Sequence, residues 1–191
     1  MFKQLKYFSM LFMVSIMLVA CGTSNETNST DPNNEEKSPA TEIQISYHLN
    51  EQSVVDTASW IKSDNQNFGL YVLPAYELSA EEPNNDVVYF KENDLHMMRI
   101  QIVTSNSDWE SLKKNTIEQL EASLNEEVET VSTPADFSKN TTVLQTKNDR
   151  ELITAYLIPK NDHMIKLTIF TQIQDNHLDA FVQMAKHLKV N

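Results

Sequence analysis

The first 21 residues place the strongest constraint on how this chain can fold, because they suit export better than a folded core. Lys3 and Lys6 precede an apolar run at 7–20 that reads YFSMLFMVSIMLVA. This run is shorter than the roughly 20 apolar residues that a bilayer-spanning helix needs. It ends in Ala20, directly before Cys21, the only cysteine of the chain. The pattern is typical of a cleavable secretory signal peptide, so we expect the folded part to begin later.

The residues around Cys21 resemble a lipid-attachment motif. Leu18-Val19-Ala20-Cys21-Gly22 is similar to the lipobox of bacterial lipoproteins. In that family a peptidase cleaves before the cysteine, whose sulfur carries a diacylglyceryl group. The resemblance implies that residues 1–20 are a lipoprotein signal peptide. It also implies that acylated Cys21 anchors the protein in the lipid bilayer of the cell membrane, on the extracytoplasmic side. An uncleaved N-terminal helical anchor is the alternative.

The charge balance narrows the class of partner. The chain has 27 acidic and 15 basic residues, and segment 1–20 holds two of the lysines and no acid. A strongly acidic chain repels phosphates, so we expect no nucleic acid as a partner. Anionic headgroups are repelled as well, so we expect membrane contact through the acyl chains on Cys21. With this sulfur acylated, no thiol remains for a disulfide or a metal.

Composition changes after residue 41. Segment 21–41 is rich in Asn, Ser, Thr and Glu and has no Val, Ile, Leu, Met or aromatic residue. Such a sequence cannot bury enough surface to offset the entropy of ordering it, so we interpret it as a disordered polar tether. Residues 42–191 have the size of one globular domain. Gly69 is the only glycine there, which excludes glycine-rich phosphate-binding loops, and we expect no cofactor.

The apolar periodicity of the domain predicts strands interrupted by helices. The strands are expected at 43–49, 68–73, 86–90, 95–103, 127–131, 141–146, 150–158 and 163–171. Residues 152–158 (LITAYLI) are apolar on both faces, which indicates a central strand. Val54, Val55, Ala58 and Ile61 recur at helical spacing and predict a short helix at 54–61.

Two longer amphipathic helices complete the prediction. Ser107-Asp108-Trp109-Glu110 has the pattern of a capping box with Ser107 as the cap. The apolar face of this helix consists of Trp109, Leu112, Thr116, Leu120 and Leu124. We expect it to pack on a sheet against Leu167 and Ile169.

The last helix is expected to be capped by Asp175 or Asn176. It would bury Leu178, Phe181, Val182, Ala185 and Leu188. The predicted fold class is therefore α+β, a largely antiparallel sheet with a central and a C-terminal helix packed on it.

This order of elements resembles the PsbP-like fold. The resemblance rests on 68–74 (FGLYVLP), the strand pair within 89–103, and the late hairpin followed by a final helix. Segment 71–83 is also similar to uncharacterised lipoproteins of Gram-positive bacteria. PsbP-like folds serve mainly as binding or assembly modules, so the resemblance implies such a role without a catalytic residue.

Motifs of known chemistry are missing from the sequence. There is no Gly-x-Ser-x-Gly and no His-x-x-x-His pair. His177 and His187 are ten residues apart in the predicted helix, too far to share an ion. His96 and His163 follow aspartates at strand positions, and antiparallel pairing could bring them together. We expect them to be ordinary edge histidines, and we predict no metal site and no catalytic residue.

The most distinctive charged segment is 77–86 (ELSAEEPNND), which we predict to be a loop stiffened by Pro83. Its carboxylates, Glu77, Glu81, Glu82 and Asp86, could collect Ca²⁺ or a basic peptide. Their spacing is not that of an EF-hand, and the alternative is a solvated loop.

Three hypotheses for function follow. The first is a non-catalytic, extracytoplasmic binding or assembly module for an envelope protein or a basic peptide. The second is an envelope enzyme with an unrecognised site, and the third is a structural accessory of an envelope complex. Titratable groups with shifted pKa values in a deep pocket would favour the enzyme. An exposed apolar patch would favour the partner module.

Overall fold

Alternating apolar and polar side chains build two antiparallel sheets. The structure is a computed structural model, and it describes residues 39–104, 108–160 and 162–190. The predicted signal peptide, Cys21, most of the tether and Ser107 lie outside these residues. Ser38–Asn191 form one compact unit. None of the helices in the described ranges is both long and apolar enough to span a bilayer.

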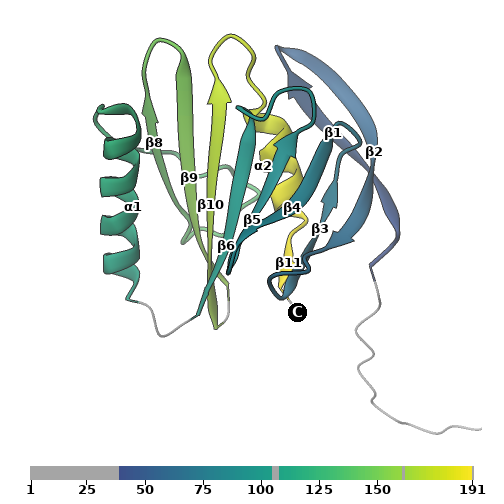
Figure 1. Cartoon of the computed structure of the whole chain (residues 1–191), viewed down its shortest axis with the longest axis horizontal. Helices are drawn as coiled ribbons and strands as arrows, with labels where there is room; N and C mark the ends of the chain where they lie inside the picture. The colour runs from purple at the N-terminus through teal and green to yellow at the C-terminus, as the bar shows by residue number, and fades with distance from the viewer. Residues whose placement is uncertain (1–38, 105–107, 161, 191) are drawn as a thin grey trace, which may run out of the picture. The chain divides into compact units, whose positions relative to one another are not determined.

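The larger sheet has seven strands in the order β4-β5-β6-β10-β9-β8-β7 (Figure 1). Their bounds are β4 Tyr76–Glu82, β5 Asn85–Phe90, β6 Met97–Thr104, β7 Glu129–Val131, β8 Thr142–Lys147, β9 Glu151–Lys160 and β10 His163–Gln172. The smaller sheet has the order β1-β2-β3-β11. Its strands are β1 Glu42–Leu49, β2 Gln52–Lys62, β3 Phe68–Val72 and β11 Lys189–Val190. The helices are α1 Trp109–Leu124 and α2 Leu178–Lys186. The predicted α+β fold class is confirmed.

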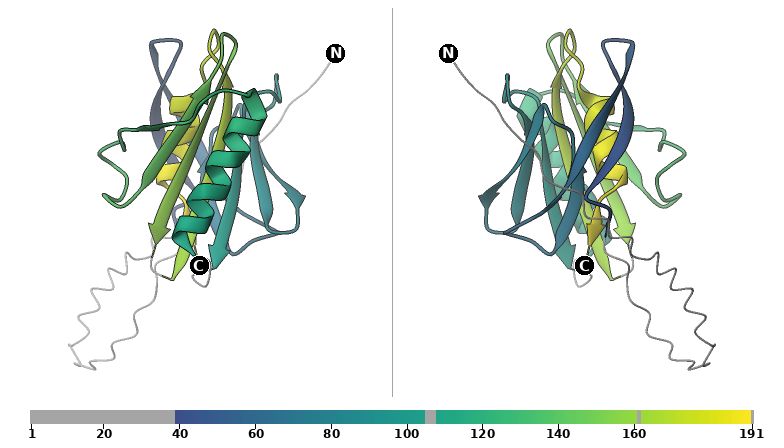
Figure 2. Two further views of the ribbon diagram at one scale, coloured as in Figure 1. Left: turned by 90° about the vertical axis from the view of Figure 1, so that its left-hand side faces the viewer. Right: turned by 90° about the vertical axis from the view of Figure 1, so that its right-hand side faces the viewer.

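The two helices lie on opposite sides of the larger sheet (Figure 2). Side chains alternate between the two faces of β9, so Ile153, Ala155 and Leu157 face one way and Tyr156 and Ile158 the other. The first face forms a core with α1 whose buried members are Leu120, Leu144, Ile153, Ala155 and Leu157. The second face joins a larger core that α2 and the smaller sheet complete. A central strand that is apolar on both faces is thus confirmed at β9.

The helix predicted at 54–61 is wrong, because this segment belongs to β2. β2 pairs with β1 along one side and with β3 along the other. Ala58 is buried, whereas Val55 and Ile61 are 55% and 39% exposed. The apparent helical spacing counted these two exposed residues as core. β-branched residues fit a pleated strand better than a helix, and two ladders of hydrogen bonds outweighed the weak local signal.

The loop predicted at 77–86 is also wrong. Most of this segment is the hairpin of β4 and β5, with a shift of register between Ala80 and Glu82. Pro83 lies in the turn rather than in a ladder, and Asn84 has a left-handed φ of 64°. Asparagine tolerates that conformation better than most residues, so the turn closes without glycine.

The helix α1 is confirmed, but its cap and its packing partners differ from the prediction. The cap is Asp108, whose carboxylate accepts from the backbone N–H groups of Glu110 and Ser111. The predicted packing against Leu167 and Ile169 is wrong, because these two side chains point to the opposite face of β10 and belong to the core around α2. An error of one residue in the facing of a strand exchanges the two sides of a sheet.

The capping of α2 is only partly as predicted. His177 holds the cap position and makes no capping hydrogen bond through its side chain. Asn176 Oδ1 accepts from the backbone N–H of Leu178 at 2.9 Å. Asp175 contributes to a different cluster, described below.

Leu120 offers a direct test of the α1 core, because its side chain is only 2% exposed and packs in that core. We expect Leu120→Ala to lower the free energy of unfolding by about 2–5 kcal/mol through lost burial and a residual cavity. The matched control is Leu95→Ala, since Leu95 is 54% exposed. Urea denaturation of both variants measures the difference. A loss below about 0.5 kcal/mol at Leu120 would contradict the packing.

Candidate metal centre

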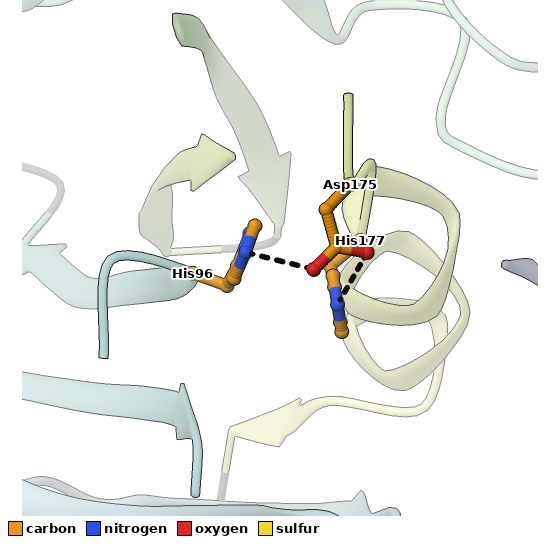
Figure 3. A group of neighbouring side chains, drawn as sticks. All are labelled: His96, Asp175 and His177. Atoms are coloured by element: carbon orange, nitrogen blue, oxygen red, sulfur yellow. Dashed lines mark ion pairs between the residues drawn. The ribbon is translucent and has the colours of Figure 1, made fainter. Parts of the chain in front are cut away.

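Three side chains from two distant parts of the chain converge beside the start of α2 (Figure 3). His96 lies in the turn between β5 and β6, directly before Met97. Asp175 and His177 lie in the connection from β10 to α2. Both imidazoles are buried, with 0% exposure at His96 and 1% at His177. The Asp175 side chain is 44% exposed and links the pair to solvent.

The carboxylate of Asp175 faces the Nε2 atoms of both rings. His96 Nε2 lies 3.4 Å from Asp175 Oδ2, and His177 Nε2 lies 3.4 Å from Asp175 Oδ1. One ligand atom from each of the three residues can be chosen so that all three atoms lie within 4.8 Å of one another. A distance of 3.4 Å is long for an N–H···O hydrogen bond, which is usually 2.7–3.2 Å. The three groups therefore face one another without closing good hydrogen bonds.

Outer partners orient two of the three groups. His177 Nδ1 lies 2.6 Å from the hydroxyl of Tyr76 on β4. When Nδ1–H donates to this hydroxyl, the lone pair of Nε2 points toward Asp175. Asn50, in the turn between β1 and β2, donates from Nδ2 to Asp175 Oδ1 at 3.1 Å. Such outer hydrogen bonds commonly fix the tautomer and orientation of metal ligands.

Aromatic packing holds the imidazoles in place. The ring centroids of His96 and His177 are 4.3 Å apart, with planes tilted by 31°. Phe90 packs against His177 at 4.4 Å, and Tyr76 contacts both His177 and Phe181. Tyr76 and Phe181 are buried and Phe90 is partly buried, so the two imidazoles are held by close packing.

Burial and charge set the protonation of the cluster. Burial lowers the pKa of His96, and burial together with the nearby His96 ring lowers that of His177. Partial burial alone would raise the pKa of Asp175, but the hydrogen bond from Asn50 and the two imidazoles outweigh it and hold that pKa below its usual range. Burial raises the pKa of the Tyr76 hydroxyl, which stays protonated. The cluster thus contains neutral imidazoles beside an ionised carboxylate at neutral pH.

The burial of the His96 ring costs stability. Among the described residues, neither Nδ1 nor Nε2 of this buried ring has a hydrogen-bond partner of good geometry. Leaving a buried polar atom unsatisfied typically costs about 1–3 kcal/mol. A cation between the rings and the carboxylate would give His96 Nε2 a partner. Zinc–ligand distances of about 2.0–2.1 Å in a tetrahedral site separate ligand atoms by roughly 3.4 Å, the same as the two distances from Nε2 to the carboxylate oxygens of Asp175.

The sequence did not predict this cluster. The possible pairing of His96 with His163 does not occur, because His163 pairs with Thr104 and Lys160 at the far ends of β6 and β9. His177 and His187 flank α2 at its two ends. The available signal was Asp175-x-His177, an acid and a histidine two residues apart just before a helix. Nothing local connected that pair to His96.

The acidic residues of segment 77–86 do not converge. Glu81 forms a two-bond ion pair with Arg99 at 2.6 and 2.7 Å. Asp86 is buried and accepts from Ser63 Oγ and Gln66 Nε2. Glu77 and Glu82 are exposed. Within the described ranges, the group of three or more possible ligand residues that comes together is His96, Asp175 and His177.

Comparison with known proteins identifies a family for this chain. A family model for a domain of unknown function, DUF8580, matches residues 39–184. The chain belongs to the DUF8580 family. The described cluster lies within the matched residues, and the family description assigns no activity to it. No curated protein matches the sequence.

Two solved structures are similar to this DUF8580 domain. One is the 1.50 Å crystal structure of a protein from Bacteroides thetaiotaomicron VPI-5482, with a TM-score of 0.44 and 9% identity over 69% of this chain. The match spans 48% of that protein, about half of its length. The other is the solution structure of cyanobacterial PsbP (CyanoP) from Synechocystis sp. PCC 6803, with a TM-score of 0.48 and 11% identity. It covers 70% of this chain and 92% of that one. A PsbP structure is thus among the similar folds, and at this level of similarity it carries no functional argument.

The ion pair of Glu81 and Arg99 predicts a pH dependence of stability. The hydrogen bonds from Arg99 lower the pKa of Glu81, and their effect exceeds the opposing effect of partial burial. A carboxyl group whose pKa is lower in the folded state stabilises the fold above its unfolded pKa and loses this contribution as the pH falls through the folded pKa. We expect Glu81→Gln to lower the melting temperature at neutral pH and to have a smaller effect at about pH 3.

The matched control is Glu92→Gln, because Glu92 lies exposed in the turn between β5 and β6. Thermal denaturation of the parent and both variants at the two pH values gives the comparison. An effect of Glu81→Gln that is equally large in acid would contradict an electrostatic role for this pair.

Proposed function

We propose that this chain is a lipid-anchored, extracytoplasmic binding module whose folded domain binds a divalent transition-metal ion, with Zn²⁺ as the reference ion. The ligands are His96, Asp175 and His177. The observation that carries the proposal is the convergence of two buried imidazoles on one carboxylate at 3.4 Å, with no hydrogen-bond partner on His96.

The donor set selects the class of ion. Imidazole nitrogen suits Zn²⁺, Cu²⁺, Ni²⁺ and Fe²⁺, whereas Ca²⁺ and Mg²⁺ prefer sites built of oxygen. Two nitrogens and one carboxylate therefore favour the first group. Three protein ligands leave a fourth position, which water or an exchangeable ligand would fill. The exposed side of Asp175 provides a path for an ion to enter.

Binding suits the surroundings of the cluster better than catalysis does. The linings of four cavities of the described residues include none of His96, Asp175 and His177, although Asn50, Gln174 and Asn176 beside Asp175 line one of about 870 Å³. An enzyme would need room for a substrate next to the ion. Phe90 and the two imidazoles pack against one another, so the ligand rings themselves do not face a cavity. We therefore assign the cluster to holding or carrying an ion.

The anchoring part of the proposal rests on the sequence. The apolar run at 7–20 ends at Cys21, and the polar segment 22–41 would hold the domain away from the headgroups. Two or more acyl chains bind a bilayer far more stably than one. A domain at the outer surface of the membrane would meet metal ions before they enter the cell.

The metal site is tested by calorimetric titration of Zn²⁺ into the full chain, purified in detergent and carrying Cys21→Ser so that no thiol contributes. We expect one Zn²⁺ per chain and no heat from Mg²⁺ or Ca²⁺. Asp175→Asn keeps the size of the side chain but removes its charge. It should weaken Zn²⁺ binding by more than the roughly 10–100-fold that loss of an outer hydrogen bond costs.

Two further variants sharpen this test. Tyr76→Phe removes only the hydroxyl beside His177 Nδ1, so its effect should fall in that 10–100-fold range. Asp179→Asn is the matched control, because Asp179 lies on α2 and bonds His48 rather than the cluster. Equal Zn²⁺ affinity in the Asp175 variant and the Asp179 variant would refute the proposed site.

The anchor is tested separately by metabolic labelling with a fatty-acid analogue in a bacterium that processes lipoproteins. We expect the parent chain to incorporate the label and to fractionate with membranes. Cys21→Ala should remain unlabelled, because no other cysteine is present. Label that persists on this variant would rule out lipidation at Cys21.

A further inference from the structure

One cavity lies on the opposite side of the larger sheet from the cluster of His96, Asp175 and His177. It has a volume of about 520 Å³ and opens between α1 and the hairpin of β4 and β5. Strands β6 and β10 form its floor, and Gln119 lies on its α1 wall. We call it the α1 groove. Its volume is in the range of known small-ligand sites, about 300–1,000 Å³.

The floor of the α1 groove is mostly polar, whereas the other face of the same strands is mostly apolar. Arg99 and Gln101 of β6 alternate with Met98 and Ile100, which are 0% exposed. The helix α1 packs on β8 and β9 and leaves this part of the sheet without a covering helix (Figure 1). Because successive side chains of a strand point to opposite faces, the charged floor and the apolar core lie on opposite sides of the same strands.

Neighbouring strands place these polar groups side by side. Arg99 is directly opposite Thr168, and Gln101 is directly opposite Lys166. Residues opposite each other on adjacent strands have Cβ atoms about 4.5–5.5 Å apart. Four polar side chains thus form a compact square in the middle of the floor.

The two cations of this square differ in their partners. The guanidinium of Arg99 is held by both carboxylate oxygens of Glu81 and lies over the ring of Phe170. The ammonium of Lys166 has the amide oxygen of Gln119 as its partner at 2.5 Å. No carboxylate of the described residues forms an ion pair with Lys166. Burial lowers the pKa of Lys166, and no neighbouring charge contributes to the shift. An ammonium that is partly buried with a neutral partner has capacity for an anion.

We propose that the α1 groove binds a small, polar monocarboxylate whose carboxyl group pairs with Lys166. The hydroxyl and amide groups of Thr168, Gln101 and Gln119 suit a ligand rich in hydroxyl or amide groups. A multiply charged anion would be repelled by Glu81 and Glu82 at the rim and by the net charge of −12. A single carboxylate on a hydroxylated body meets both conditions.

Sugar probes test the proposal, because glucuronate and glucose share a ring and differ by one carboxyl group. Each is titrated into the ¹⁵N-labelled full chain carrying Cys21→Ser, in detergent, and the backbone amide shifts are followed by NMR. We expect glucuronate to shift amides of β6, β10 and α1. Glucose should bind at least about tenfold more weakly, as expected for loss of one charge-assisted hydrogen bond.

Two lysine variants locate the effect. Lys166→Met keeps the length of the side chain and should weaken glucuronate binding about tenfold or more while leaving glucose unchanged. Lys114→Met is the control, because Lys114 lies on α1 with its side chain 76% exposed and pairs with Glu118. An unperturbed amide spectrum outside the groove shows that a variant remains folded.

The proposal would be overturned by equal affinity for glucose and glucuronate, by glucuronate shifts that map outside the groove, or by no shift at all at tens of millimolar glucuronate. A loss of binding in the Lys114 variant as large as that in the Lys166 variant would do the same. The Zn²⁺ titration of the Lys166 variant should match the parent, which keeps this proposal independent of the metal site.

Discussion

The pairing of β10 with β9 on one side and β6 on the other is the constraint on which the rest of this structure depends. It fixes which side chains of β10 enter the core around α2, namely Ile165, Leu167 and Ile169. The intervening Lys166, Thr168 and Phe170 then line the α1 groove. A slip of one residue would bury the lysine and expose the aliphatic side chains. The apolar core thus enforces the register that displays the polar floor.

The strongest sequence signals were those that a single element determines alone. β9, β10 and α1 could be predicted because their apolar residues repeat with the period of a strand or a helix. β2 could not, because its central position between β1 and β3 arises only from pairing with distant residues. β4 was missed for a related reason, although the strand at 86–90 was predicted. The exposed carboxylates of β4 resembled a solvated loop, whereas Glu81 bonds through its side chain to Arg99 on β6, the strand beyond β5.

The cluster of His96, Asp175 and His177 could not be predicted from local sequence patterns. His96 comes from a turn before β6, and its partners come from the segment before α2. No short spacing joins them, and a lone buried histidine looks like any other core residue. Asp175 was predicted as a helix cap, a role for which its chemistry is equally suited. Only the folded chain brings Asp175 beside His96 and His177.

The late position of α2 and β11 in the chain affects the order in which the domain can fold during synthesis. The core between the two sheets needs Phe181 and Met184, which leave the ribosome only after all the strands of the larger sheet. At about 5–20 residues per second, Met184 follows the end of β4 by roughly 5–20 s and the end of β10 by roughly 1–2 s. β3 likewise stays at the edge of its sheet until Lys189 and Val190 pair with it. A domain built in this order closes its main core only when the synthesis of its last helix is complete.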